Sequence, residues 1–436
     1  MLSRDEQTTM RPVVLGGGQV GSSIDSPDWP IWNHRERDHL ERVLESGWWA
    51  FEGPAEAEFE QRFAGLQTAR HGLCVANGTV ALQLGLEALD IGVGDEVIVP
   101  GFTWQATAAA VVDVNAMPIL VDADPETYCP DPSGIERAIT PRTKAIIVVH
   151  LYDSLSDMDR ILEIAARHHL HVVEDCAHSH GSQWNGRGVG SVGDIGTFSF
   201  QSSKTLTAGE GGFVTTNDDT LFERLYSLRN CGRRKKGPIT STTPAVQSGN
   251  YRMTEWQSAI LLAQLERFEE QMSTKERNAE ILDASLGRIP GITPMRRDRQ
   301  VTRRNLYAYV FRYSEEEWQG LSCRAFRKAM SDEMGFEFGA PYRPLNMSSL
   351  YRPQTKKRHH LSDQYWDALD PGNYALPVAE HAYHHEAVRV LHQNLLTNSR
   401  KISQIPKAVQ RLRGFLPELL DWERSLPEGE WGAPPE

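Results

Sequence analysis

The chain has 436 residues, and its 46 lysines and arginines against 58 aspartates and glutamates give a formal net charge of −12 at pH 7. Phosphate backbones are bound mainly by basic side chains, so we expect no nucleic-acid partner. The longest apolar runs, such as 145–149, fall far short of the ~20 residues of a membrane-spanning helix, and the first residues form no secretory signal. The five scattered cysteines predict a cytoplasmic protein with no disulfide and no metal site: Cys74, Cys129, Cys176, Cys231 and Cys323.

Short apolar runs alternate with amphipathic stretches through the first half of the chain. A Gly-rich, polar arm extends to about Gly21, and a charged, helix-like stretch over 33–63 is interrupted at Gly47 and Gly53. Continuous apolar strands separated by helices are typical of a mostly parallel sheet that helices cover on both faces, which predicts a doubly wound α/β domain. The predicted strands cover 72–76, 96–100, 118–122, 145–152 and 171–175, and the predicted helices cover 81–89, 104–114 and 157–169.

The pattern changes after Glu255. Apolar residues recur at helical spacing over 256–287, which predicts one long helix or two joined ones. A predicted strand over 306–313 and a predicted helix over 323–335 follow, so we expect a smaller α+β region at the C-terminus. The expected division is an N-terminal arm (1–28), a large α/β domain (29–270), a small α+β domain (271–425) and a loose tail (426–436).

Two segments carry residues suited to chemistry. The apolar strand 171–175 ends in Asp175, at the carboxyl edge of the sheet, where α/β proteins bind ligands; alternatively, this carboxylate only caps the next element. The second segment, GTFSFQSSKTLTAGEGG (196–212), places Lys204 among hydroxyl groups and glycines, without a charged neighbour for several residues. A lysine in a poorly solvated pocket becomes a nucleophile for carbonyl groups, whereas most single lysines are solvated surface residues.

Two further features complete a possible cofactor site. The turn Asn77-Gly78-Thr79 leads from a strand into a helix, whose first N–H groups can bind an anion; otherwise it is an ordinary connection. Trp104 follows another strand and is either a core residue or a stacking platform. A carboxylate, an amine, an aromatic face and an anion site are together what pyridoxal phosphate requires for its pyridine nitrogen, its aldehyde, its ring and its phosphate.

Longer strings strengthen this interpretation: ANGTVALQLGLEALDIGVGDEVIVPGFTW, VDADPETY, VVEDCAHSHGS, GDIGTFSFQSSKTLTAGEGG and GNYRMTEWQSAILLAQL. In this order they resemble the DegT/DnrJ/EryC1/StrS family of sugar aminotransferases, and the resemblance runs from about Trp29 to about Leu396. It implies a fold-type I pyridoxal-phosphate enzyme with a mostly parallel, seven-stranded type of sheet and a smaller C-terminal domain.

The resemblance implies chemical roles for four residues. Lys204 would bind the cofactor covalently and move a proton between the cofactor and the substrate carbon. Asp175 would pair with the pyridine nitrogen and keep it protonated, which makes the ring an electron sink. His178 would contact the ring or its 3-oxygen, and Trp104 would stack on the ring.

Four other residues would surround the cofactor phosphate. Gly78, Thr79 and Ser199 would bind it within one subunit. Asn250, in the string GNYRM, resembles a residue that reaches the cofactor phosphate of a partner subunit. The resemblance therefore implies a homodimer with composite active sites.

Within the family, WPIW, GSQWNGRGVGSVGDIG and the last third of the chain resemble glutamine-dependent ketocyclitol aminotransferases, which act on scyllo-inosose or 2-deoxy-scyllo-inosose in aminoglycoside biosynthesis. This implies L-glutamine or glutamate as the amino donor and a cyclic ketone as the acceptor, with Asp153, Tyr342, Arg343 and Asn346 near the acceptor. Many relatives have glycine at the position of Asp153 and histidine at that of Asn346. A carboxylate there suits a neutral ring better than an anionic nucleotide sugar, unless it pairs with a nearby arginine or faces solvent.

Other functions remain open at this point. Less closely, the same stretches resemble 3-amino-5-hydroxybenzoate synthases, and an aminotransferase for nucleotide-linked ketosugars is a further alternative. The dehydratases of the family have histidine in place of the lysine, so Lys204 argues against that reaction. A non-catalytic relative would have no reason to keep Lys204, Asp175, Ser199 and Asn250 together.

Overall fold

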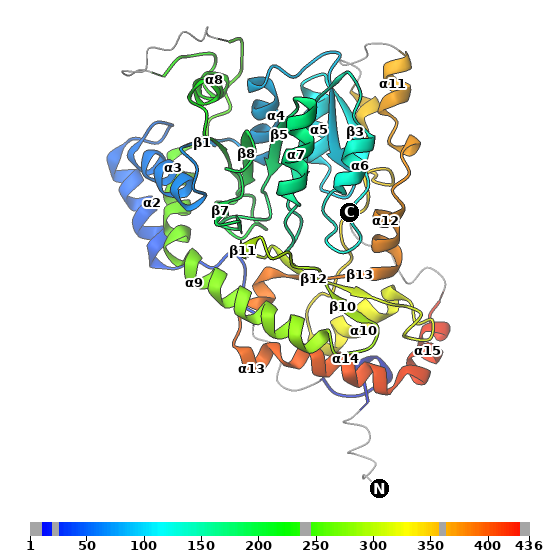
Figure 1. Cartoon of the computed structure of the whole chain (residues 1–436). Coiled ribbons are helices and arrows are strands. Elements are labelled where there is room, and N and C mark those ends of the chain that lie inside the picture. Colours follow the sequence, from blue (N-terminus) through cyan, green and yellow to red (C-terminus); the bar gives the residue numbers. More distant parts are fainter. Residues whose placement is uncertain (1–10, 20–25, 236–245, 357–362, 428–436) are drawn as a thin grey trace.

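The computed structural model describes residues 11–19, 26–235, 246–356 and 363–427 (Figure 1). Its main sheet has seven strands in the order β1-β9-β8-β5-β4-β2-β3. The five strands from β8 to β3 run parallel, whereas β9 is antiparallel to both of its neighbours. The strands are β1 (His71–Val75), β2 (Glu96–Pro100), β3 (Met117–Val121), β4 (Thr143–Val149), β5 (His171–Asp175), β8 (Ile195–Ser199) and β9 (Gly212–Thr216).

Side chains of the central strands alternate between two apolar cores, one on each face of the sheet. In β2, Ile98 belongs to one core, and Val97 and Val99 belong to the other. This confirms the predicted sheet with helices on both faces. One face is covered by α4 (Gly78–Ala88), α5 (Ala106–Asp113) and α8 (Asp219–Arg229), and the other by α3 (Pro54–Leu66), α6 (Pro132–Arg137), α7 (Met158–His168) and part of α9 (Glu255–Leu286).

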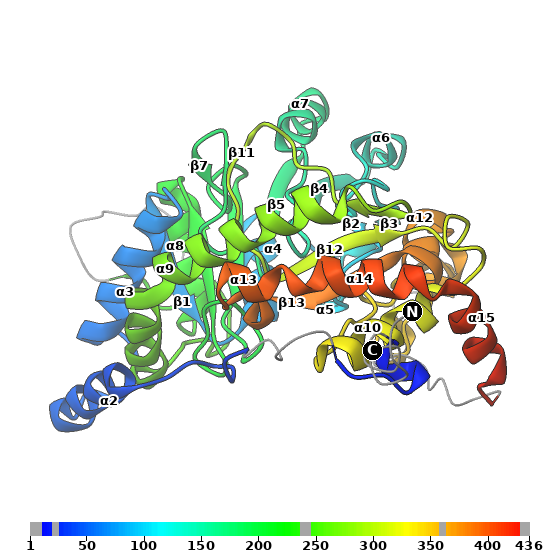
Figure 2. The ribbon, with the colours of Figure 1, turned by 90° about the horizontal axis from the view of Figure 1, so that it is seen from below.

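The region after residue 286 forms a second layer around a three-stranded antiparallel sheet in the order β10-β12-β13. The long helix α9 reaches it without a break, so the expected helix over 256–287 is a single one, and residue 270 lies inside it. Figure 2 shows α9 beside the C-terminal helices. The elements are β10 (Ile292–Pro294), β12 (Ala308–Tyr313), β13 (Ala387–Leu391), α10 (Cys323–Met334), α13 (Ser399–Ile402), α14 (Gln404–Gly414) and α15 (Leu416–Ser425).

Shorter elements connect these layers. A third sheet, in the order β11-β6-β7, joins both regions of the chain: β6 and β7 come between β5 and β8 in sequence, and β11 comes between β10 and β12. No helix in the described part of the chain combines the length and apolar character that crossing a membrane requires. The remaining elements are α2 (His34–Ser46), β6 (Gln183–Trp184), β7 (Arg187–Gly188), β11 (Val301–Arg303), α11 (Asp363–Leu369), α12 (Pro377–His381), and the short helices η1 (Val13–Leu15), η2 (Pro353–Thr355), η4 (Pro371–Asn373), η5 (Ala382–Glu386) and η6 (His392–Leu395).

Two predicted strands are shorter in the structure. The strand expected over 145–152 ends at Val149, and the one expected over 306–313 begins at Ala308. The backbone N–H of Tyr152 donates to a histidine ring, and that of Tyr307 donates to the carbonyl of Tyr152. The apolar run continues past the ladder because these residues are buried against the site. Much of the expected arm (1–28) and tail (426–436) lies outside the described residues.

Candidate active site

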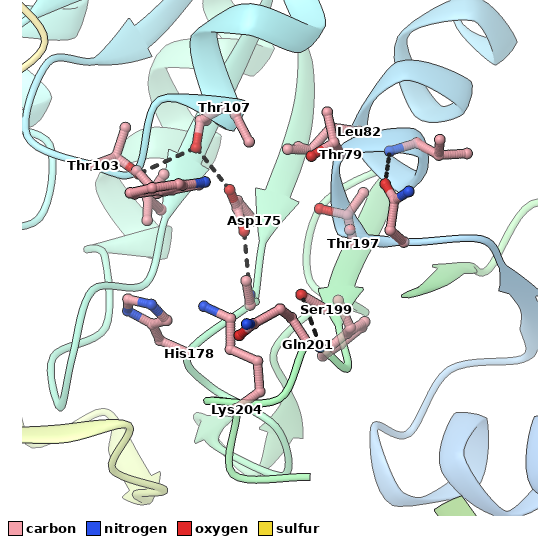
Figure 3. A pocket seen from close by; sticks show the side chains of 18 of the residues that line it. Thr79, Leu82, Thr103, Thr107, Asp175, His178, Thr197, Ser199, Gln201 and Lys204 are labelled. Carbon is pink, nitrogen blue, oxygen red and sulfur yellow. Dashed lines mark hydrogen bonds between the residues drawn. The ribbon is translucent and has the colours of Figure 1, made fainter. Parts of the chain in front are cut away.

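The main cavity has a volume of about 670 Å³ and lies at the carboxyl ends of the parallel strands (Figure 3). Val149, Asp175 and Ser199, which end β4, β5 and β8, all line it. The N-terminus of α4 forms a second part of its wall. Tyr307, which directly precedes β12, and Arg389 in β13 form a third part. The cavity is thus built where the two layers meet, at the edge that α/β sheets commonly use for ligands.

Asp175 is a buried carboxylate whose two oxygens each accept one hydrogen bond. Thr107 Oγ1 donates to Oδ2 over 2.9 Å, and the backbone N–H of Ala177 donates to Oδ1 over 3.2 Å (Figure 3). Burial raises the pKa of Asp175 above its usual value, although these hydrogen bonds and the charge of Lys204 act in the opposite direction. A carboxylate held in this way is well placed to bind a cationic N–H.

Lys204 lies in a tight loop after β8, and its amine points into the cavity (Figure 3). Its backbone N–H donates to the carbonyl of Gln201 over 2.9 Å, which closes the turn. Burial lowers the pKa of Lys204, against the opposing effects of Tyr307 and Asp175. Its Nζ lies 4.6 Å from the centre of the Tyr307 ring. A buried amine of reduced basicity is the form in which lysine attacks carbonyl groups.

His178 is held as a neutral ring by its surroundings. Burial and the nearby charge of Lys204 lower its pKa far below the usual value. The backbone N–H of Tyr152 donates to Nδ1 over 3.2 Å, so the proton is on Nε2, which lies 3.1 Å from Tyr342 Oη. Tyr307 stacks on the histidine ring at 3.8 Å between centroids. Burial raises the pKa of Tyr307, but the charge of Lys204, the hydrogen bonds with Ser203 and Tyr342 and the charge of Arg389 together lower it below its usual value.

The turn between β1 and α4 approaches the end of β8 closely. Asn77 Oδ1 accepts the backbone N–H of Val80 over 2.9 Å and so caps the helix. A Cβ added at Gly78 would lie 2.8 Å from the Cβ of Ser199, so only glycine fits without a shift. Thr79 and Ser199 line the cavity beside this turn. The N–H groups of the first turn of α4 and the hydroxyls of Thr79 and Ser199 can all donate to a phosphate, and Gly78 lets the backbone come close to it.

Two other predicted cofactor residues occupy different positions. Trp104 lines the rim of the cavity, partly exposed, with its ring 5.7 Å from that of Tyr342. Asn250 does not line the cavity. It is exposed, pairs with Asn230 in an isolated β-bridge, and accepts the N–H of Arg252 over 3.3 Å.

The four predicted substrate residues lie in four different places, and only one of them lines the main cavity. Tyr342 lines the main cavity. Arg343 lies in a small neighbouring pocket that shares Trp104 and Tyr342 with the cavity, and its Nε donates to Tyr383 Oη over 3.2 Å. Asn346 lines neither space, because its amide donates to the carbonyl of Tyr374 and to a carboxylate of Glu380.

The expectation that Asp153 lies beside the substrate does not agree with the geometry. Tyr152 has a left-handed backbone conformation (φ 57°), and the next side chain lies in a separate small pocket, 3.8 Å from Arg304. Burial raises the pKa of Asp153 to about 7, while Arg304 acts to lower it. This is the arginine pairing that the sequence left open, so the argument from Asp153 for a neutral acceptor does not apply.

Several cavity residues were not predicted from the sequence, and three of them matter for the chemistry of the site: Thr107, Tyr307 and Arg389. Thr107 lies in an alanine-rich helix, and the other two lie in or next to apolar strands far along the chain. No motif marks them. The one available signal was Arg389 itself, a charged residue in the otherwise apolar strand β13.

Comparisons with known proteins agree with this site. The profile described as the DegT/DnrJ/EryC1/StrS aminotransferase family matches residues 30–393. The L-glutamine:2-deoxy-scyllo-inosose aminotransferase of Streptoalloteichus tenebrarius is 40% identical over 390 residues, which cover 84% of this chain and 92% of that protein. The L-glutamine:scyllo-inosose aminotransferase of Streptomyces griseus is 38% identical over 413 residues, which cover 92% and 97% of the two chains.

Solved structures show the same fold. The crystal structure of 3-amino-5-hydroxybenzoic acid synthase has a TM-score of 0.74 at 31% identity and covers 89% of this chain and 100% of that one. The structure of DesI in the presence of its TDP-sugar product has a TM-score of 0.77 at 27% identity and covers 96% and 100%. The fold and the cavity therefore define a fold-type I, pyridoxal-phosphate-dependent aminotransferase. The chain belongs to the DegT/DnrJ/EryC1/StrS aminotransferase family.

The residues of the cavity fit pyridoxal phosphate. A buried amine and a buried carboxylate line the same space, and the space at Gly78, which a Cβ would fill, leaves a helix N-terminus open to an anion. These groups match the aldehyde, the pyridine nitrogen and the phosphate of the cofactor in chemical character.

Proposed function

We propose that this enzyme transfers an amino group from L-glutamine to a ketocyclitol of the scyllo-inosose type, in the biosynthesis of an aminoglycoside. The observation that carries the proposal is the set of relatives with this activity in their names, at 38–40% identity over 84–92% of the chain. The structural neighbours 3-amino-5-hydroxybenzoic acid synthase and DesI are more distant in sequence, at 31% and 27% identity.

In this proposal Lys204 holds the cofactor covalently and moves the proton at the substrate carbon. Its reduced basicity supports both roles, because a neutral amine can attack an aldehyde and accept a proton. Asp175 binds the pyridine N–H with a carboxylate fixed by Thr107 and Ala177. Bound pyridoxal phosphate supplies an electron sink for the carbon from which the proton is removed.

We assign the other cofactor contacts by chemistry. Gly78, Thr79 and Ser199 bind the phosphate, because they combine first-turn N–H groups with hydroxyls. His178 contacts the ring side of the cofactor as a neutral imidazole, and Trp104 closes the cavity by stacking. Tyr342 and Arg343 remain candidates for contact with the cyclic ketone. Asp153 and Asn346 have no place in this assignment, since their side chains are engaged elsewhere.

We further propose a homodimer in which Asn250 completes the partner's site. An exposed asparagine outside its own cavity supports this arrangement. Large exposed aromatic side chains near the N-terminus also support a covered surface: Trp32, Trp48 and Trp49 are 68%, 52% and 51% exposed. A dimer interface would remove these rings from water.

Two further proposals concern the domain boundary and the cellular compartment. The large and small domains divide near residue 270, within the unbroken helix α9, which would then link them as one rigid rod. The enzyme works in the cytoplasm, since all five cysteines are free thiols and four of them are buried.

Parallel assays test the acceptor. The purified enzyme with L-glutamine is offered scyllo-inosose, 2-deoxy-scyllo-inosose and a nucleotide-diphosphate ketosugar, and the aminated product is identified by mass spectrometry. We expect the highest kcat/KM with one of the two inososes. A higher value with the nucleotide-linked sugar would overturn the ketocyclitol assignment and leave the aminotransferase intact.

A further inference from the structure

Among the described residues that line the main cavity, two carry a positive charge: Lys204 and Arg389. The proposed function assigns Lys204 to the cofactor, which leaves Arg389 without a role. Arg389 belongs to β13, in the sheet β10-β12-β13. The Gly78 turn, to which we assign the phosphate, lies between β1 of the seven-stranded sheet and α4. The charge of Arg389 therefore enters the cavity from the other layer of the molecule.

The backbone of Arg389 is fixed, while its guanidinium has donors to spare. The main chain exchanges two hydrogen bonds of 2.9 Å with Gly339. The closest carboxylate, that of Glu337, lies 3.4 Å from Nη2, and its side chain is 56% exposed. Nε is buried and has no hydrogen-bond partner among the described residues. An exposed ion pair of this length contributes little, and a buried N–H without a partner is costly.

The neighbours of Arg389 place its charge near the reacting amine. Tyr307, His178 and Tyr342 each experience it, since its charge acts to lower the pKa of all three, beside the larger effects of burial. Tyr307 also lies against the amine of Lys204. Tyr307 thus lies close to the amine of Lys204 and also experiences the charge of Arg389.

An α-amino acid carries its amine and its carboxylate on a single carbon. When the amine reaches the position at which Lys204 reacts, the carboxylate must lie a few ångströms away and be neutralised. A guanidinium binds a carboxylate through two parallel hydrogen bonds, which fixes orientation as well as charge. A neutral ketocyclitol has no corresponding need for a cation.

We infer that Arg389 binds the α-carboxylate of the amino donor. The inference rests on the proposed function, because it takes glutamine as the donor. It gives the site a donor subsite on the small-sheet side, occupied in the half of the reaction that does not involve the ketone. The role is one of binding and orientation, without a bond made or broken at the arginine.

Binding of 4-carbamoylbutanoate, which is glutamine without its amine, tests the inference on the holoenzyme by titration calorimetry. Arg389→Met should weaken its binding about 10- to 150-fold, the range for hydrogen bonds to a charged group. The methyl ester of the same compound, which lacks the charge, should bind the wild type and the variant equally. Equal binding of the free acid to both proteins would overturn the inference.

Kinetics with glutamine alone give a second readout, since the absorbance of the cofactor changes without any ketone. Arg389→Met should raise the half-saturating glutamine concentration, and Arg389→Lys should restore part of it. Glu337→Gln should lower that concentration, because it removes a competing carboxylate while leaving the arginine in place. Arg312→Met is the matched control, an arginine of the adjacent strand β12 that does not line the cavity.

The outcomes separate the two levels of the argument. If the wild type reacts with neither glutamine nor glutamate, the proposed function fails. If the wild type reacts and Arg389→Met changes only the half-reaction with the ketone, the donor subsite is wrong and the aminotransferase stands. Unchanged binding in Glu337→Gln together with unchanged binding in Arg389→Met would also overturn the subsite.

Discussion

At the scale of single residues, burial acts on the two central ionisable groups in opposite directions. It lowers the pKa of Lys204 and raises that of Asp175, so both groups move toward their neutral forms. Each charge opposes this effect on the other. The cavity therefore favours a lysine that can act as a nucleophile, and it leaves the carboxylate in need of a cationic partner such as a protonated pyridine nitrogen.

Replacing the lysine tests its assigned role. We expect Lys204→Ala to fold, because the side chain extends into a cavity and leaves no packed core behind. Borohydride reduction should attach the cofactor to the wild type and not to the variant, as read by protein mass. Turnover should fall about 10³-fold or more, since the nucleophile and the proton carrier disappear together. Lys144→Ala, at an exposed position of β4, serves as the control; near-normal turnover in Lys204→Ala would exclude the assignment.

At the scale of elements, the turn from β1 to α4 depends on the absence of one Cβ. Gly78→Ala would bring a methyl group to 2.8 Å from the Cβ of Ser199, so the turn or the end of β8 must move. We expect cofactor affinity, measured by titrating the apoenzyme, to fall about tenfold or more, which corresponds to ~1.4 kcal/mol.

Gly65→Ala is the control for that substitution. It lies in α3, where an added Cβ meets nothing within 4 Å, so it should leave cofactor affinity unchanged and slightly stabilise the helix. Wild-type affinity in Gly78→Ala would show that the turn does not hold the phosphate.

A series of buried hydrogen bonds connects helix α9 to the loop after β8. Lys275 in α9 donates to Asn305 Oδ1 over 2.7 Å, and Asn305 Nδ2 donates to Thr205 Oγ1 over 2.8 Å. Thr205 Oγ1 lies 3.3 Å from His180 Nδ1, and Nε2 of that ring lies 2.9 Å from the carbonyl of Ser199. The long helix is thereby connected to the residue after Lys204 and to the end of β8.

Lys275, at one end of this series of hydrogen bonds, should make the stability of the fold depend on pH. Burial lowers the pKa of Lys275 to about 7, so the folded protein holds this lysine neutral at a pH where the unfolded chain protonates it. The lysine therefore stabilises the fold least below about pH 7, and its contribution improves as the pH rises toward the unfolded value near 10.4. We expect the Tm of wild type relative to Lys275→Met to rise between pH 7 and pH 10. A difference that is constant over this range would show that the lysine is charged in the fold.

Several elements were predictable from sequence because their signal is local. The predicted strands 96–100 and 171–175 match β2 and β5 residue for residue, because the β-branched apolar residues inside each mark a strand buried on both faces. Asp175 and Lys204 were also marked locally, the first as a carboxylate at the end of an apolar strand and the second as a single charge among hydroxyl-bearing residues and glycines.

Other features depend on the conformation of single residues or on distant packing. Asp153 lies away from the main cavity, next to Tyr152 in its left-handed conformation, which no pattern in the sequence marks. Arg389 enters the site through the pairing of β13 with β12, two strands that are about 75 residues apart in sequence. Contacts of this kind follow from the packing of the two layers and have no local sequence signal.

At the scale of the whole molecule, two distant segments converge on the loop that carries Lys204. Trp29 Nε1 donates to the carbonyl of Ser202 over 2.9 Å, and His392 Nε2 lies 3.1 Å from the carbonyl of Ser203. The rings of Trp29 and His392 meet edge to face at 4.4 Å. The segment before α2 and the segment after β13 thus hold adjacent carbonyls of one loop. A change in the packing of either segment would move the lysine.

The proposed homodimer predicts that two damaged variants recover activity when they pair, which a monomeric enzyme could not do. Lys204→Ala damages the site of its own chain, whereas Asn250→Ala, in a composite dimer, damages the partner's site. In a mixed dimer both defects then fall on one site, and the other site is intact. Random pairing of equal amounts makes half of the dimers mixed, so about a quarter of all sites should be active.

Co-expression of the two variants with different tags, followed by activity measurement on the mixture, tests this. We expect activity of about a quarter of the wild-type value, well above that of either parent variant. Lys204→Ala mixed with Asp175→Asn is the control without recovery, because these two residues line the same cavity of one chain and every dimer then has two damaged sites. If Lys204→Ala mixed with Asn250→Ala is no more active than its parents, Asn250 does not complete the partner's site.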